Sequence, residues 1–199
     1  MSQSPVIIAS GGANLASLKF ALARLGVDVP VTEDPDRINN ASHVLLPGVG
    51  AARDAMMRLD AAELTALIPQ LDQPVLGICL GMQLLFSGSD EDQAKCLGII
   101  PGQAYRFAQD STLPVPQMGW NQIRLGASSS SLLNGIADGG YAYFIHSYAL
   151  PEGDYTRATA EYAAPFSAVV EQDNFYGTQF HPERSAGLGA RLLANFLDL

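Results

Sequence analysis

The segment Leu76-Gly77-Ile78-Cys79-Leu80-Gly81 places one cysteine between two glycines, directly after an apolar run that begins at Val75. A helical stretch, Leu80 to Phe86, follows, so the sequence predicts a strand, a sharp turn at Cys79 and a helix. A side chain at the apex of such a turn is exposed and held at strained backbone angles, and glycines beside it let strand and helix approach closely. This pattern is typical of a nucleophile elbow.

Cys79 therefore has the setting of a reactive thiol. The first turn of the helix after it presents unpaired N–H groups, and this positive end stabilises a thiolate, the form that attacks an amide carbonyl. A lone intracellular cysteine is more often a small buried apolar residue. The paired glycines and the flanking strand and helix favour the nucleophile instead.

Strands and helices alternate around the elbow. Apolar runs at Val6 to Ala9 and Val44 to Leu46 are followed by helical stretches near Asn14 to Leu25 and Ala51 to Leu59. Such alternation predicts an α/β fold with a mostly parallel central sheet flanked by helices. In the second half we expect some antiparallel pairing, followed by an amphipathic helix over Ser185 to Leu197. The strand-like runs there are Tyr105 to Phe107, Tyr141 to Ile145, Ala168 to Val170 and Phe175 to Phe180.

The composition favours one domain over residues 1–199. The chain is 48% apolar and carries a formal net charge of −9. This charge repels nucleic acid and anionic lipid, so neither is an expected partner. No apolar run reaches the roughly 20 residues of a membrane helix and no leader pattern is seen, so we expect a cytoplasmic protein. Nothing in the sequence predicts a cofactor or a metal site.

His181 and Glu183 form the second part of the predicted site. They follow an extended run, and a period of two in extended chain puts both side chains on the same side. Pro182 supports this because it disfavours helical angles at His181. The carboxylate can then accept the proton of one imidazole nitrogen, leaving the other nitrogen free to take the cysteine proton.

The remaining histidines and the second cysteine lack such a setting. His43 lies in a predicted core strand and is interpreted as a packed or surface residue. For His146, which follows the run Tyr141 to Ile145, the sequence does not decide between such a residue and a functional one. Cys96 lies near the polar segment Asp90 to Asp92 and is interpreted as structural. Two cysteines are too few for a disulfide framework, and both are predicted to be free thiols.

A predicted oxyanion hole completes the constellation. Acyl transfer needs N–H donors aimed at the oxygen that becomes negative. The N–H of Leu80 is one predicted donor. The segment Pro47-Gly48-Val49-Gly50 offers another, because glycine lets a peptide plane rotate toward a substrate. Alone this segment is only a turn signal, but beside the elbow it indicates an oxyanion hole of Gly48, Val49, Gly50 and Leu80.

These three segments, in this order, resemble the class I, triad-type glutamine amidotransferases. That family shows an oxyanion strand, a Gly-x-Cys-x-Gly elbow and a His-Pro-Glu. Further segments are similar to one of its branches, the glutaminase subunits of imidazole glycerol phosphate synthase, and the resemblance spans nearly the whole chain. The segments are Leu46 to Gly50, Leu76 to Leu84, Gln117 to Asn121 (Gln-Met-Gly-Trp-Asn) and Tyr143 to Tyr148 (Tyr-Phe-Ile-His-Ser-Tyr).

The resemblance implies a role for each matching residue. Cys79 would be the nucleophile, His181 the general base and acid, and Glu183 the orienter of the imidazole. L-Glutamine would be held by Gly50, Gln83 and the backbone of Ser147 and Tyr148. The alternative for Gln83, a solvated helix face, is disfavoured because it lies one turn from Cys79. The implied partner interface comprises Asn14, Gln117, Met118, Gly119, Trp120, Asn121, Tyr143 and Arg184.

Some positions depart from the family pattern. Ala9 to Asn14 reads Ala-Ser-Gly-Gly-Ala-Asn where the family tends to show Asp-Tyr-Gly-x-Gly-Asn. Ala52 replaces a common phenylalanine, and Arg184 a common lysine whose point charge differs from a planar guanidinium. Trp120, the chain's single tryptophan, is either a docking residue or ordinary core, with similar weight for each.

The resemblance also implies a partner. The chain would hydrolyse L-glutamine to glutamate and ammonia through a thioester on Cys79. The ammonia would then pass to a cyclase subunit, a (β/α)8 barrel, in a heterodimer that makes imidazole glycerol phosphate and aminoimidazole carboxamide ribotide in histidine biosynthesis. The chain itself indicates a separate synthase, since one domain uses its whole length and no phosphate-cradling motif appears. Two alternatives remain. One is the amidotransferase subunit of another synthase, for anthranilate, guanylate or carbamoyl phosphate, and the other is a non-catalytic regulatory module of the same fold.

Overall fold

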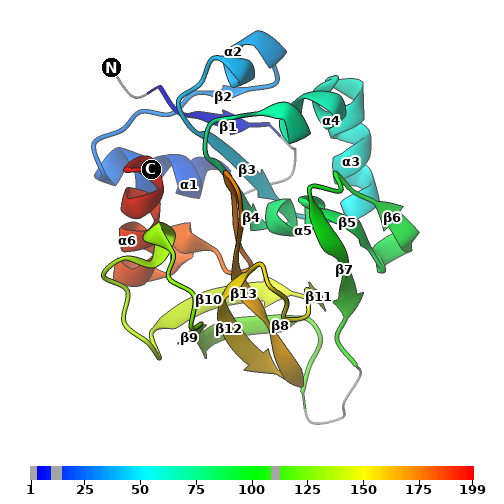
Figure 1. The fold of residues 1–199 in the computed structure, drawn as a ribbon, viewed down its shortest axis with the longest axis vertical. Helices are drawn as coiled ribbons and strands as arrows, with labels where there is room; N and C mark the ends of the chain where they lie inside the picture. The colour runs from blue at the N-terminus through cyan, green and yellow to red at the C-terminus, as the bar shows by residue number, and fades with distance from the viewer. Residues whose placement is uncertain (1–3, 10–14, 109–112) are drawn as a thin grey trace.

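A sheet of eight strands runs through the centre of the molecule (Figure 1). The structure is a computed structural model, and it describes residues 4–9, 15–108 and 113–199. From one edge to the other, the strands are β2 (Val31–Thr32), β1 (Val6–Ile8), β3 (Val44–Gly48), β4 (Val75–Cys79), β14 (Phe175–Thr178), β13 (Ala164–Gln172), β12 (Thr156–Tyr162) and β9 (Arg124–Leu125). Neighbours from β2 to β14 pair parallel, and those from β14 to β9 antiparallel. The predicted α/β fold with antiparallel strands in its second half is confirmed.

Each face of the parallel strands has its own core, because successive side chains in a strand point to opposite faces. Ile7 and Leu45 belong to the cluster that includes α1 and α6, whereas Val6, Ile8 and Val44 belong to the cluster with α2 to α5. Figure 1 shows α1 and α6 on one side of β1, β3 and β4, and α3 and α4 on the other. The helices are α1 (Leu15–Arg24), α2 (Pro35–Asn39), α3 (Ala52–Ala61), α4 (Leu64–Leu67), α5 (Leu80–Leu84) and α6 (Ala186–Leu197). None of the helices in the described residues is long and apolar enough to cross a membrane.

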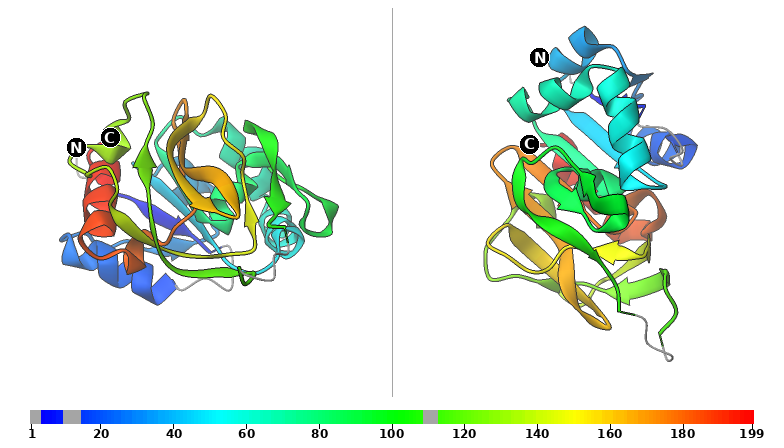
Figure 2. Two further views of the ribbon diagram at one scale, coloured as in Figure 1. Left: turned by 90° about the horizontal axis from the view of Figure 1, so that it is seen from below. Right: turned by 90° about the vertical axis from the view of Figure 1, so that its right-hand side faces the viewer.

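Two smaller sheets flank the centre (Figure 2). One has the order β11 (Tyr148–Ala149), β7 (Ile100–Arg106), β5 (Phe86–Ser89) and β6 (Ala94–Lys95), and the other is the antiparallel pair of β8 (Gln117–Gln122) and β10 (Tyr141–His146). Short 3-10 turns complete the chain: η1 (Ile68–Gln70), η2 (Glu91–Gln93), η3 (Ser131–Leu133) and η4 (Pro182–Arg184). The end of β10 lies close to the end of β4, where Cys79 Sγ is 3.6 Å from the Ile145 carbonyl oxygen.

The helix after Cys79 is shorter than predicted. The sequence predicts a helix from Leu80 to Phe86, but α5 ends at Leu84 and Phe86 begins β5. Phe86 is fully buried and pairs with Ile100 of β7. Pairing with a strand from later in the chain therefore overrides the local helical preference of this segment.

The contact of α5 with β3 predicts a large loss of stability for one small substitution. A Cβ on Gly81 would overlap the carbonyl oxygen of Leu46. We expect Gly81→Ala to lower the free energy of unfolding by about 3 kcal/mol or more, or to prevent folding, because backbone must move to make room. Denaturant unfolding measures this. Gly187→Ala is the matched control, since a Cβ there meets nothing within 4 Å in helix α6. It should be neutral or stabilising by up to about 1 kcal/mol, and equal losses in both variants would contradict the packing argument.

Candidate active site

Cys79 lies at a strained turn between β4 and α5. Its backbone angles are φ 55° and ψ −110°, a positive φ that is uncommon for a residue other than glycine. A Cβ on Gly77 would lie 2.7 Å from the carbonyl oxygen of Gly81, so the two glycines permit the close contact of strand and helix. The predicted geometry of a nucleophile elbow is confirmed here.

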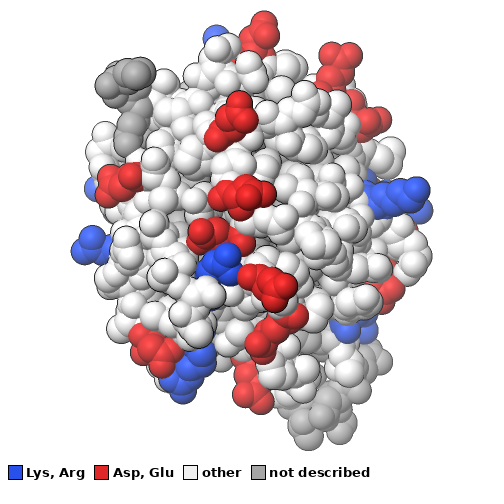
Figure 3. Space-filling view, in the orientation of Figure 1, with Lys and Arg blue, Asp and Glu red and all other residues white. Residues whose placement is uncertain are grey.

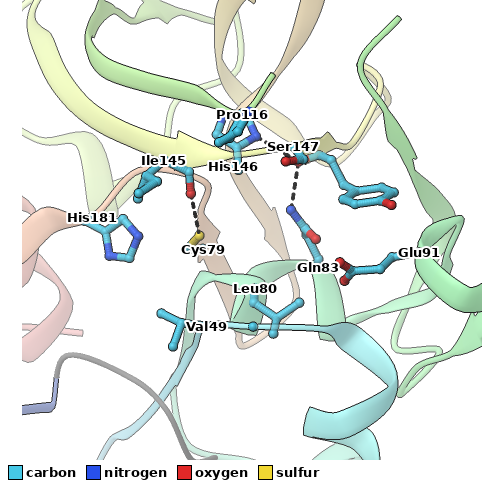
Figure 4. Close-up of a pocket in the computed structure, with 12 residues that line it drawn as sticks. Val49, Cys79, Leu80, Gln83, Glu91, Pro116, Ile145, His146, Ser147 and His181 are labelled. Atoms are coloured by element: carbon cyan, nitrogen blue, oxygen red, sulfur yellow. Dashed lines mark hydrogen bonds between the residues drawn. The ribbon is translucent and has the colours of Figure 1, made fainter. Parts of the chain in front are cut away.

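His181 and Glu183 meet beside the sulfur. His181 Nδ1 lies 2.8 Å from Glu183 Oε1, and both side chains are buried. Burial lowers the pKa of His181, but the Cys79 sulfur and the Glu183 carboxylate outweigh burial and raise the pKa to about 10. Figure 4 shows the imidazole and the sulfur side by side. The arrangement therefore favours the protonated imidazole of His181 beside the sulfur.

The contact between His181 and Cys79 is loose in the resting chain. His181 Nε2 is buried and makes no hydrogen bond of standard geometry with the described residues, although the sulfur is close enough to raise the imidazole pKa. The interaction of the imidazole with the sulfur therefore raises the His181 pKa although Nε2 makes no hydrogen bond of standard geometry. Catalytic hydrogen bonds are often long before substrate binds.

The sequence prediction for Glu183 had the correct contact and the wrong cause. His181 is extended, with φ −93° and ψ 102°, but Pro182–Arg184 form the 3-10 turn η4. Glu183 therefore reaches back to the imidazole from a turn and not along an extended strand. Ser185 holds this turn, because its Oγ donates to the carbonyl oxygen of His181 at 2.7 Å and accepts from the Tyr143 N–H at 2.9 Å.

A pocket of about 280 Å³ opens beside Cys79 and His181 (Figure 4). Its walls come from the end of β3, the elbow, η2 and the turn from β10 to β11. The other lining residues are Val49, Gly50, Leu80, Gln83, Glu91, Pro116, Ile145, His146, Ser147 and Tyr148. All four residues predicted to bind substrate are therefore part of this pocket.

Three of the four residues predicted to form the oxyanion hole line the pocket, and the fourth does not. Val49, Gly50 and Leu80 line the pocket, and Gly50 has φ 91°, a conformation that favours glycine. Gly48 lies underneath instead: it pairs with Cys79, and a Cβ on it would lie 2.8 Å from the amide nitrogen of Gly81. Gly48 thus supports the elbow by its small size and does not line the pocket.

Gln83 is buried, so the alternative of a solvated helix face is wrong. Its Nε2 donates to the Tyr148 carbonyl oxygen and to Gln179 Oε1, both at 2.9 Å. Gln179 Nε2 lies 3.7 Å from Cys79 Sγ. Sequence reasoning missed Gln179, although its place two residues before His181 was a signal that it lies near the site; in the structure it directly follows β14.

Glu91 is a second residue that sequence reasoning missed. It lines the pocket from η2, and its Oε2 accepts a hydrogen bond from the N–H of Ala52 at 2.8 Å, at the start of α3. The sequence showed only a polar loop at Asp90 to Asp92. Glu91 supplies a carboxylate at the end of the pocket away from His181 (Figure 4).

The other histidines and Cys96 are placed as packed residues. His43 is buried against Phe196, and burial lowers the pKa of His43. His146, left open by the sequence, is buried at the pocket, its Nδ1 lies 2.7 Å from the Tyr148 carbonyl oxygen, and burial lowers the pKa of His146 to about 4. Cys96 is half-buried, and burial with the nearby Glu91 raises the pKa of its thiol to about 11. A thiol that stays protonated agrees with a structural role.

The predicted interface residues divide into exposed and buried ones. Trp120 is 52% exposed and Met118 62%, so core packing of the tryptophan is excluded. Trp120 packs edge-on against Tyr143 of β10, and the Arg184 guanidinium lies 5.7 Å from the Tyr143 ring centroid. Gly119 and Asn121 are half-buried, while the side chain of Gln117 is buried and does not contribute to this surface. Asn14 and most of the atypical Ala9 to Asn14 segment lie outside the described residues.

The chain was compared with protein-family models and with named proteins. Residues 6–199 match the family model described as "Glutamine amidotransferase class-I". The chain is 47% identical to the "Imidazole glycerol phosphate synthase subunit HisH" of Vibrio cholerae serotype O1, over all of both chains. It is 50% identical to "Imidazole glycerol phosphate synthase subunit HisH 2" of Legionella pneumophila (strain Paris), over 97% of this chain and 96% of that protein.

Solved structures share the fold at low sequence identity. A putative GMP synthase protein from Thermoplasma acidophilum superimposes with a TM-score of 0.75 at 18% identity, covering 100% of this chain and 94% of that chain. The glutaminase domain of Trypanosoma brucei CTPS, solved with bound acivicin, gives 0.68 at 12% identity, covering 99% and 94%. At such identities the likeness concerns the fold alone.

Proposed function

We propose, because this chain belongs to the class-I glutamine amidotransferase family, that it releases ammonia from L-glutamine as the glutaminase subunit of an imidazole glycerol phosphate synthase. The observation that carries the chemistry is the meeting of Cys79, His181 and Glu183 at the edge of one pocket. The identity of 47% to 50% with the two named subunits supports the choice of synthase.

The first half of the reaction forms a thioester. The Cys79 thiolate attacks the carboxamide carbon of glutamine, and the carbonyl oxygen becomes an oxyanion beside Val49, Gly50 and Leu80. The His181 imidazolium gives its proton to the departing nitrogen, so ammonia leaves and a γ-glutamyl thioester remains. Glu183 holds the imidazole orientation and stabilises its positive charge.

The second half returns the free enzyme. Neutral His181 takes a proton from a water molecule as that water attacks the thioester carbonyl carbon. The carbon–sulfur bond breaks, glutamate leaves, and the thiolate is again paired with the imidazolium. The balance is one glutamine and one water giving one glutamate, one ammonia and one proton, which the new γ-carboxyl group releases.

The pocket supplies complementary groups for the α-carbon end of an amino acid. Glu91 offers a carboxylate to an ammonium group, and Gly50 with the backbone of Ser147 and Tyr148 offers peptide groups. Both Nε2 hydrogens of Gln83 are already bonded within the chain, so the group it can offer a substrate is Oε1, an acceptor. These groups favour a zwitterionic substrate over a simple amide.

Replacing Glu91 by Gln tests this assignment. Glu91→Gln keeps an oxygen for the Ala52 N–H but removes the charge that faces the ammonium. We expect KM for glutamine to rise about 10- to 100-fold, since a hydrogen bond between charged groups contributes roughly 1.5–3 kcal/mol. The turnover number should fall less than fivefold, because the reacting end is unchanged. Steady-state glutamate release measures both, and Asp92→Asn, a change at a residue that does not line the pocket, is the matched control. Unchanged KM in Glu91→Gln would reject this role.

The surface that we assign to the synthase partner is the exposed side of the β8–β10 pair. Met118, Trp120 and Tyr141 are all more than half exposed on the β8–β10 pair, with Tyr143 and Arg184 beside them. Exposed aromatics next to an arginine are typical of an interface centre. Acidic side chains dominate the charged groups on the face shown in Figure 3, and the formal net charge is −9. We therefore assign a protein partner, a (β/α)8-barrel cyclase, and not nucleic acid.

The experiment that tests the function mixes the chain with candidate synthase partners. Glutamine-dependent product formation should appear with the cyclase of imidazole glycerol phosphate synthase and its substrate, and should need both subunits. Partners that make anthranilate, guanylate or carbamoyl phosphate should give ammonia-dependent synthesis only. Glutamine-dependent synthesis with one of those, and none with the cyclase, would reassign the chain to that synthase.

A further inference from the structure

We propose that Gln179 is a positioning residue for the nucleophile: its side-chain amide, oriented through Gln83 by the carbonyl group of Tyr148, donates a hydrogen bond to the Cys79 thiolate. The inference rests on the proposed function, in which Cys79 attacks glutamine. It follows from a chain of hydrogen bonds whose direction is fixed at one end.

The fixed end is the Tyr148 carbonyl oxygen, which can only accept. Gln83 Nε2 lies 2.9 Å from it and His146 Nδ1 lies 2.7 Å from it. Gln83 must therefore present its nitrogen to this oxygen, and His146 must carry its proton on Nδ1. The orientation of the Gln83 amide is thus set by the backbone of the pocket wall itself.

The orientation of the Gln83 amide determines the orientation of the Gln179 amide. The second hydrogen of Gln83 Nε2 is donated to Gln179 Oε1 at 2.9 Å. With its oxygen facing Gln83, Gln179 presents Nε2 to Cys79 Sγ at 3.7 Å. An amide N–H can only donate, so the sulfur must accept. A thiolate is a much better acceptor than a thiol, and the contact therefore favours the ionised form.

Burial makes this contact effective. Gln179 is fully buried and Gln83 is 4% exposed, so solvent does not compete for the amides and the local dielectric is low. The protonated thiol has a different partner, because Cys79 Sγ can donate to the Ile145 carbonyl oxygen at 3.6 Å. Ionisation removes that donor and leaves the Gln179 N–H to hold the sulfur in place.

The arrangement connects the substrate pocket to the nucleophile. Tyr148 and Gln83 line the pocket that would hold glutamine. Gln179 contacts the sulfur but does not line the pocket. A shift of the Tyr148 carbonyl group is therefore transmitted to the sulfur through two amides. Among the described residues, the other ionisable groups that face the sulfur or its pocket are His181 just before η4, Glu183 in η4, His146 from β10, Tyr148 from β11 and Glu91 from η2. None of them needs to change charge for this relay to act.

The test replaces the donor and follows the reactivity of the sulfur. Gln179→Glu keeps the shape but puts an oxygen beside the sulfur, and Gln179→Met keeps the length but removes both polar groups. We measure the rate of Cys79 alkylation by iodoacetamide against pH, by mass analysis of the Cys79 peptide, in the chain alone and bound to the cyclase. In both variants the midpoint of the alkylation rate against pH should rise by about one pH unit, which is equivalent to a tenfold loss of thiolate below the midpoint. The rise should be larger for Gln179→Glu than for Gln179→Met. The turnover number should fall about tenfold or more, with a smaller change in KM.

A matched control comes from the segment before β4. Gln73 lies two residues before β4 begins, at the end of the strand away from Cys79, and its Nε2 donates to the Ile38 carbonyl oxygen at 2.8 Å. Gln73→Met removes a similar amide bond and should leave the alkylation profile as in the wild type. Gln179 variants that fold, but whose alkylation profile and turnover number match the wild type, would overturn the inference.

A measurement on the unaltered side chain covers the case in which both Gln179 variants fail to fold. The side-chain amide signal of Gln179 in the nitrogen-15 spectrum should titrate with the same midpoint as Cys79 alkylation, and this titration should vanish in Cys79→Ala. A flat signal would overturn the inference. If the wild type shows neither a reactive Cys79 nor glutamine hydrolysis, the proposed function fails and the inference fails with it. A reactive, active wild type with a flat signal rejects the inference alone.

Discussion

Cys79→Ala should abolish glutamate release from glutamine, with a loss of about 10⁴-fold or more, measured with the synthase partner bound. The sulfur forms the bond to the carboxamide carbon. Cys79 is the one cysteine that lines the pocket among the described residues, and the hydroxyl-bearing Ser147 and Tyr148 line it from the turn between β10 and β11. Removing the nucleophile of a triad leaves only the small acceleration that comes from binding and the oxyanion hole.

Two controls separate chemistry from folding. Product formation from added ammonia should be unchanged with Cys79→Ala, because the variant still binds the partner and ammonia bypasses the glutaminase. Cys96→Ala, a change at the other free cysteine, should keep wild-type glutamate release. Glutamate release by Cys79→Ala at the wild-type rate would end the hypothesis of cysteine catalysis.

His181→Asn should lower the turnover number by about 10³- to 10⁴-fold, since it removes both the imidazolium beside the sulfur and the proton donor for ammonia. Glu183→Gln should also lower the turnover number, but by a smaller factor, because the imidazole remains and loses only its carboxylate partner at 2.8 Å. Stopped assays of glutamate release give both values. His43→Asn is the matched control, as His43 packs against Phe196 away from the pocket, and it should retain turnover.

The double variant His181→Asn with Glu183→Gln gives a sharper test. If the carboxylate acts through the imidazole, the double variant should be no slower than His181→Asn alone, because residues that act as a unit are not additive. Independent, multiplying losses would mean that Glu183 acts on the substrate directly, against the geometry of η4.

The elbow and its sheet could be predicted from sequence because their signals are local. Cys79 lies between two glycines that are two residues away on either side, and the apolar runs of β1, β3 and β4 alternate with helices within short distances. Local patterns of this kind predict β1, β3 and β4, but they predict neither the two-residue strand β2 nor the parallel pairing of β14 with β4.

The residues that sequence reasoning missed depend on contacts between distant segments. Gln179 meets Gln83 across 96 positions, and Glu91 meets Ala52 across 39. No periodicity reports such contacts. The predicted end of the helix at Phe86 was wrong for the same reason. Phe86 belongs to β5, a strand that pairs with β7 from later in the chain. Glu183 shows the reverse case, in which a correct contact was predicted from an extended geometry that η4 does not have.

Trapping the acyl intermediate tests the central claim most directly. Wild-type chain bound to the synthase is mixed with glutamine, quenched in acid within the first turnovers, digested and analysed by mass. The account predicts a γ-glutamyl group on the peptide that contains Cys79, appearing before glutamate and absent when glutamate replaces glutamine. Full-rate glutamine hydrolysis with no adduct on that peptide, or with the glutamyl group on another residue, would contradict it.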